Sequence, residues 1–202
     1  MILTKLVYGK DGLFQIYIDE EPACKIDDET VYREKLKEGM ELSQELFEKL
    51  FERSAFVTVR KDCTRLLSRK SYTKKELRRK LKEKGHSDSA IDKAFVLLEE
   101  NGLLDDIEYA KNYIRESAEY KKLGRYKIAY QLKLKGISDE IIQQLMEEEM
   151  PPEEDHVREW VEKFAFGVAR DDRKQLDKIR RRLYGKGFSI DRINAAIEEY
   201  FA

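Results

Sequence analysis

The side chains in this chain that could do chemistry are mainly lysines and arginines, and they gather in particular stretches. Residues 60–84 hold 12 basic and 3 acidic residues, and residues 170–187 hold 8 basic and 3 acidic, although the whole chain has a net charge of −1. A solvated helix face does not require such an excess of positive over negative residues. It favours contact with an anionic partner, either a phosphate backbone or an acidic protein surface.

We expect the contact residues to come from three basic groups. Charge and expected exposure select these residues: Arg65, Arg69, Lys70, Lys74, Lys75, Arg78, Arg79, Lys82, Lys121, Lys122, Arg125, Lys127, Arg173, Lys174, Arg180 and Arg181. No base-reading motif accompanies them, so sequence-specific recognition is not expected. Tyr120, Tyr126 and Tyr130 flank the middle group. We expect at least one of these tyrosines to pack in the core and the others to be available for a contact surface.

Residues typical of catalysis or of metal binding are sparse. The chain has no GxxxxGK[ST], GxGxxG or HExxH pattern, and its two histidines lack nearby ligand partners. His86 is expected to be a half-buried turn residue, and Cys63 a buried thiol. The acidic pairs 105–106 and 171–172 stand where helices should begin, so capping explains them. We therefore predict no enzymatic activity, no cofactor and no metal.

One short phrase occurs three times at a fixed interval, as "LKEKGHS" (81–87), "LKLKGIS" (132–138) and "LYGKGFS" (183–189). Its glycines are Gly85, Gly136 and Gly187, spaced 51 residues apart, and its serines are Ser87, Ser138 and Ser189. Glycine suits the left-handed residue just past a helix, and serine suits the N-cap of the next helix. The phrase therefore predicts a helix end and a helix start joined by a tight turn, and its period predicts a modular array.

The elements around these turns predict a mainly α fold with three tandem three-helix repeats of 51 residues and a small N-terminal β-rich subdomain. Each repeat should read long–short–short, with first helices over about 56–70, 105–124 and 154–172. Alternating apolar residues in "TKLVY", "LFQIYID" and "EPACKID" predict three strands before them. We place the boundaries as follows: the subdomain and a helix in 1–55, and the repeats in 56–104, 105–150 and 151–202.

The stretches "NGLLDDIEYAKNYIRES" (101–117) and "KLGRYKIAYQLKLKGIS" (122–138) resemble the RecX family of bacterial recombinase regulators. "SRKSYTKKELRRKLKEKG" (68–85) resembles the opening repeat of that family, and Tyr109 stands where the family usually has phenylalanine. The resemblance implies three tandem three-helix units. It also implies binding to the RecA recombinase filament on single-stranded DNA, with inhibition of filament growth or activity, and a role in recombination and DNA repair.

Two further expectations concern partners and location. The alternative function is a nonspecific nucleic-acid-binding helical repeat protein without a recombinase partner. Single-stranded DNA is a candidate partner under either hypothesis, whereas no apolar run approaches the roughly 18 residues of a membrane span. We expect a cytoplasmic protein, with a monomer as the simplest oligomeric state.

Overall fold

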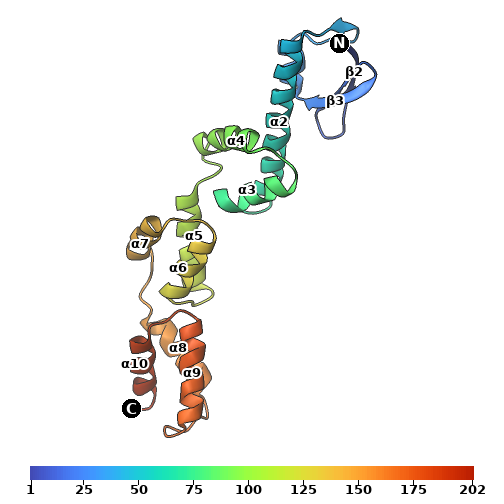
Figure 1. Ribbon diagram of the computed structural model, residues 1–202. Helices are drawn as coiled ribbons and strands as arrows, with labels where there is room; N and C mark the ends of the chain where they lie inside the picture. The colour runs from blue at the N-terminus through green and yellow to red at the C-terminus, as the bar shows by residue number, and fades with distance from the viewer. The chain divides into compact units, whose positions relative to one another are not determined.

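The computed structural model describes residues 1–202, which form two compact units (Figure 1). Unit 1 comprises Met1–Leu104 and unit 2 comprises Asp105–Ala202. The fold is mainly helical, with a four-stranded antiparallel sheet at the N-terminus, so the expected fold class is confirmed. None of the helices is long and apolar enough to cross a membrane.

Unit 1 begins with a sheet whose strand order is β3-β2-β1-β4. The strands are β1 (Ile2–Tyr8), β2 (Phe14–Ile18), β3 (Glu21–Ile26) and the short β4 (Met40–Glu41), which the apolar alternation did not reveal. The helix α1 (Asp28–Arg33) lies between β3 and β4. One face of the sheet buries Leu3, Ile16 and Ile26 against Leu50 of the following helix, as the period-2 pattern requires.

That following helix, α2 (Gln44–Leu67), serves both parts of unit 1. Its first half packs on the sheet through Leu50, and its second half places Val59 and Cys63 in a separate core. The helix therefore runs without a break through the boundary that we placed between residues 55 and 56. Burial raises the pKa of the Cys63 thiol to about 11, and burial does the same for Cys24.

The second core of unit 1 is completed by α3 (Lys74–Glu83) and α4 (Asp88–Glu100). Thr73 and Glu76 form a reciprocal capping box at the start of α3. Ser87 accepts a hydrogen bond from the backbone N–H of Ala90 and so caps α4. His86 is half-buried in the turn between them, where its Nε2 lies 2.9 Å from a carboxylate oxygen of Asp62.

Unit 2 contains two further three-helix sets. The first comprises α5 (Asp106–Glu119), α6 (Arg125–Leu134) and α7 (Asp139–Glu148), and the second comprises α8 (Glu154–Ala165), α9 (Arg173–Gly185) and α10 (Ile190–Tyr200). Positions separated by 51 residues have the same place in the three cores. Leu81, Leu132 and Leu183 are each fully buried, and Gly85, Gly136 and Gly187 have φ of +85°, +94° and +96°.

Two expectations about unit 2 were wrong in detail. The helix expected over 154–172 ends at Ala165, because Gly167 adopts a φ of +74° and reverses the chain, so the third set is not long–short–short: α8 has 12 residues and α9 has 13. Neither Tyr120, Tyr126 nor Tyr130 packs in the core; they are 81%, 62% and 57% exposed. Ile128 and Leu132 already fill the inward face of α6, which leaves the tyrosines of that helix outside. The repeat boundaries stay a prediction.

Candidate partner-binding surface

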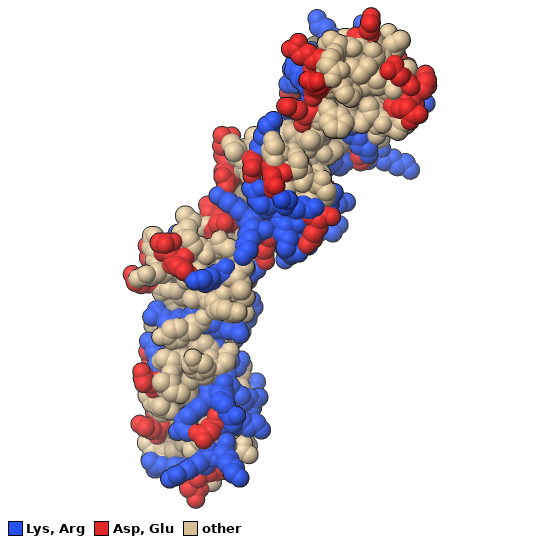
Figure 2. All heavy atoms as spheres, in the orientation of Figure 1, with Lys and Arg blue, Asp and Glu red and all other residues tan.

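The first basic group lies at the end of α2 and on α3, where Figure 2 shows Lys and Arg gathered. Most of its charges meet carboxylates. Five of the expected contact residues form ion pairs: Arg65 with Asp62, Lys74 with Glu99, Arg78 with Asp88 and Asp92, Arg79 with Glu83, and Lys82 with Asp88. Lys75 is exposed, and Lys70 lies 4.5 Å from the ring centre of Tyr72. Arg69 is exposed and forms no ion pair. Positive charge in this group is thus largely offset within unit 1.

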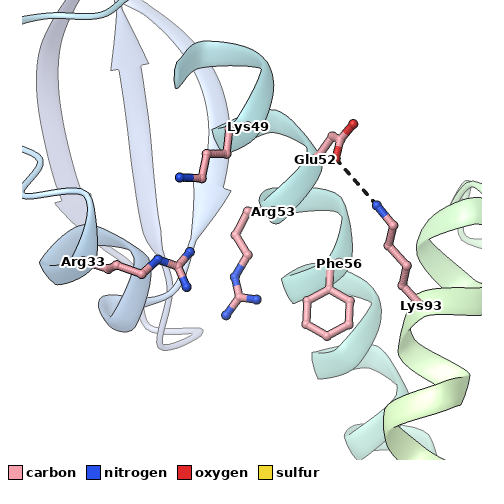
Figure 3. Close-up of a pocket in the computed structure, with 6 residues that line it drawn as sticks. All are labelled: Arg33, Lys49, Glu52, Arg53, Phe56 and Lys93. Atoms are coloured by element: carbon pink, nitrogen blue, oxygen red, sulfur yellow. Dashed lines mark ion pairs between the residues drawn. The ribbon is translucent and has the colours of Figure 1, made fainter. Parts of the chain in front are cut away.

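The same matching of charges occurs in a pocket between α1, α2 and α4 (Figure 3). This cavity of about 350 Å³ is lined by Phe56, Glu52 and four cations, namely Arg33, Lys49, Arg53 and Lys93. Lys93 pairs with Glu52, and Arg53 pairs with Asp27. Hydrogen bonds from Lys49 and Arg33 lower the pKa of Glu34. Because every cation of this lining pairs with a carboxylate, and Arg33 and Lys49 share that of Glu34, the pocket has little charge to offer an anionic ligand.

The middle basic group is divided between the surface and the junction of the two helix sets in unit 2. Lys121 lies 5.2 Å from the ring centre of Tyr113, and Lys127 is half-buried without an ion pair. Lys122 pairs with Glu159 of α8. The guanidinium of Arg125 lies 3.8 Å from the buried carboxylate of Glu153. Two of these four cations therefore hold the helix sets together.

The third basic group lies on and around α9, where Lys and Arg again gather (Figure 2). Arg180 pairs with Asp177 at 2.8 Å and also donates to Asn194, and Arg181 donates to the backbone oxygen of Asp177. Arg173 and Lys174 are exposed and form no ion pair. The expected contact residues of this group thus divide into two that are engaged and two that are available.

Three further cations near α9 were not among the expected contact residues, and none forms an ion pair with a carboxylate. They are Lys178, Arg182 and Lys186. The sequence does contain a signal for them. With Lys174 they recur every four residues, whereas Asp177 stands three and four residues before Arg180 and Arg181, where it can pair on the helix surface.

The turn "KGF" (186–188) of the third repeat caps the first turn of α6. Gly124, the N-cap of α6, has no side chain to accept the free backbone N–H groups there. Gly124 N–H donates to the oxygen of Lys186 at 2.9 Å, and Tyr126 N–H donates to the oxygen of Gly187 at 3.2 Å. The N–H of Arg125 donates to the Glu153 carboxylate at 2.8 Å. The junction therefore supplies from outside the cap that the sequence of α6 lacks.

This junction needs glycine on both sides. A Cβ added at Gly124 would come within 2.6 Å of the backbone nitrogen of Phe188, and one added at Gly187 would come within 2.7 Å of the backbone oxygen of Gly124. Gly85, at the matching place in the first repeat, has no atom within 4 Å of an added Cβ. The three glycines share a turn conformation, but Gly187 also permits the close backbone approach that fixes α6 against the third repeat.

Comparison with known families finds three matches, arranged in chain order. Residues 60–95 match the model of the first three-helix domain of RecX, residues 105–146 the model of the second, and residues 152–197 the model of the third. Each matched range falls on one of the three helix sets described above.

Similar whole proteins give the same result. A "Regulatory protein RecX" of Caldanaerobacter subterraneus subsp. tengcongensis is 30% identical over 98% of this chain and 98% of its own length. The protein of that name from Clostridium botulinum (strain Alaska E43 / Type E3) is 29% identical over 98% of this chain and 95% of its own. A crystal structure of RecX from Lactobacillus salivarius superposes with a TM-score of 0.65 at 26% identity, over 72% of this chain and 96% of that one. Another, titled "Crystal structure of regulatory protein RecX", has a TM-score of 0.75 at 22% identity over 98% of both chains.

Proposed function

The chain belongs to the RecX family of regulatory proteins, and we propose that it binds the RecA recombinase filament on single-stranded DNA and inhibits its extension or activity. The protein would thereby modulate recombination and DNA repair in the cytoplasm. The observation that carries the proposal is the set of exposed cations without carboxylate partners on these helical repeats. Arg69, Arg173 and Lys174 are expected contact residues of this kind.

Inhibition of this type needs no reactive group. A filament grows by adding protomers, so a protein that occupies the place of a protomer or separates two of them stops growth by its bulk alone. Several weak contacts spread over tandem repeats give a high overall affinity, because each contact that forms raises the effective concentration of the groups that make the next one. Unpaired cations favour such contacts, since no ion pair within the protein has to break first.

The alternative function, nonspecific nucleic-acid binding without a recombinase, uses the same exposed cations. The two functions differ in whether RecA adds affinity. A protein that recognises the filament gains contacts with RecA protomers that naked DNA cannot provide, whereas a nonspecific binder loses phosphate contacts that RecA already covers.

We expect the protein to bind RecA-coated single-stranded DNA at least tenfold more tightly than the same DNA alone, which corresponds to about 1.4 kcal/mol of added contact. Fluorescence anisotropy of the protein carrying a surface dye, titrated with filament or with naked strand at equal salt, measures the ratio. A ratio of one or less would favour the nonspecific binder.

A further inference from the structure

Four cations form a stripe along α9, the longest helix of the third repeat. Lys174, Lys178 and Arg182 of α9 and its C-cap residue Lys186 are four residues apart, which places them on successive turns, each about 40° further round the helix than the one before. From first to last they span about 18 Å. None of the four forms an ion pair with a carboxylate. We call these residues the α9 stripe.

Aromatic rings of α8 hold the last two cations of the α9 stripe. The guanidinium carbon of Arg182 lies 4.1 Å from the ring centre of Phe164, and the Lys186 Nζ lies 3.5 Å from that of Trp160. The two rings are stacked 5.3 Å apart. A cation–π contact fixes the position of a charged group without cancelling its charge. The rings therefore orient two positive charges that remain available to an anion.

These charges repel one another in the protein. Lys163 lies 5.3 Å from the ring centre of Trp160 and brings another cation to the same place. Burial, followed by repulsion from Lys163 and Arg182, lowers the pKa of Lys186. Holding like charges close together raises the free energy of the unbound protein, and a bound anion would remove this repulsion. The first basic group differs, because there carboxylates have already taken the place of an anion.

We infer that the α9 stripe binds the phosphate backbone of single-stranded DNA. A row of evenly spaced cations fits a polymer whose charges are evenly spaced, better than it fits the scattered carboxylates of a protein surface. Phe166, just past the end of α8, is 86% exposed, and single-strand binders use exposed aromatic side chains to stack unpaired bases. The inference rests on the proposed function in one respect: we take the bound strand to be the single-stranded DNA inside the RecA filament.

The test measures how the affinity for a short oligo-deoxythymidylate depends on salt, in the wild type and in the variant Lys178→Gln/Arg182→Gln/Lys186→Gln. This variant lacks three of the inferred phosphate contacts. We expect the slope of log affinity against log salt to become shallower by about 2, because each contact to a single strand contributes about 0.7. Between about 50 and 200 mM salt, the full-length wild type should then lose about 20-fold more affinity than the variant does.

A control variant removes the same number of charges from ion-paired sites. Lys93→Gln/Arg115→Gln/Arg158→Gln leaves the α9 stripe intact, since these side chains pair with Glu52, Glu149 and Glu199. This variant should keep the wild-type slope within about 0.5. Trp160 is the only tryptophan of the chain. Its emission should change when the wild type or the control binds the strand.

Several outcomes would overturn the inference. They are an absence of measurable wild-type binding to the strand, an unchanged slope in the α9 variant, an unchanged Trp160 emission on binding, and duplex DNA bound as tightly as the single strand. A variant that loses affinity for RecA filaments while keeping the wild-type slope on naked DNA would assign the stripe to a protein surface instead. None of the DNA titrations contains RecA, so a failure of the proposed function is detected separately, by filament binding.

Discussion

Replacing Gly187 with alanine should destabilise the protein far more than the same change at Gly85. Both glycines have positive φ, so alanine at either costs about 1–2 kcal/mol of backbone strain. At Gly187 the added Cβ also meets backbone atoms of Gly124 and Lys127, which cannot rotate away as a side chain would. Separating the backbones breaks the hydrogen bonds that cap α6. We expect a total loss of about 4 kcal/mol in the free energy of unfolding at Gly187.

The Gly85→Ala variant is the matched control, because its Cβ points into open space. Urea unfolding followed by circular dichroism gives both values, and hydrogen exchange of the Arg125 and Tyr126 amides locates the effect. These amides should exchange much faster in Gly187→Ala than in the wild type, and at the wild-type rate in Gly85→Ala. Equal losses in the two variants would show that the close approach of Gly187 to Gly124 contributes no stability.

Glu153→Ala should cost about 3 kcal/mol in the free energy of unfolding. The side chain of Glu153 is 3% exposed, accepts the Arg125 N–H, and pairs with Arg192 of α10 and with the Arg125 guanidinium. Removing one member of a buried pair leaves its partners uncompensated, which is more costly than losing a surface pair. Glu153→Gln retains an acceptor for the N–H and should lose about half as much.

The adjacent residue provides the control for this prediction. Glu154 is exposed and also pairs with Arg192, at 3.5 Å, so Glu154→Ala should change stability by less than about 0.5 kcal/mol. Thermal and urea unfolding of the three variants under the same conditions give the ranking. If Glu153→Ala resembled Glu154→Ala, the buried carboxylate would not be what joins the two helix sets of unit 2.

The architecture could be predicted well because its signals are local. The "KGxS" phrase contains its own helix end and helix start, and Leu81, Leu132 and Leu183 lie in equivalent core positions because each is set by helical spacing within one repeat. The second role of Gly187 could not be predicted in this way. Its partner Gly124 is 63 residues earlier in the chain, and the same phrase around Gly85 makes no such contact.

Charge counts located the basic groups but could not tell available cations from engaged ones. The first group has the larger net charge, yet Arg78 and Lys82 are paired with Asp88, a residue beyond the counted stretch. At the end of α9, Arg182 and Lys186 have no carboxylate partner and are oriented by rings from α8. Contacts such as these depend on which helices pack together and therefore appear only in the tertiary structure, whereas the pair of Asp177 with Arg180 follows from spacing within α9.

The most direct measurement adds the purified protein to preformed RecA filaments on single-stranded DNA and follows ATP hydrolysis over time. A regulator that blocks growth or promotes disassembly should make the hydrolysis rate decline progressively, at protein concentrations well below that of RecA. The decline should be weaker for a variant with Arg173 and Lys174 changed to glutamate and with normal helical circular dichroism. A hydrolysis rate that stays constant as the wild-type protein approaches the RecA concentration would contradict the proposed function.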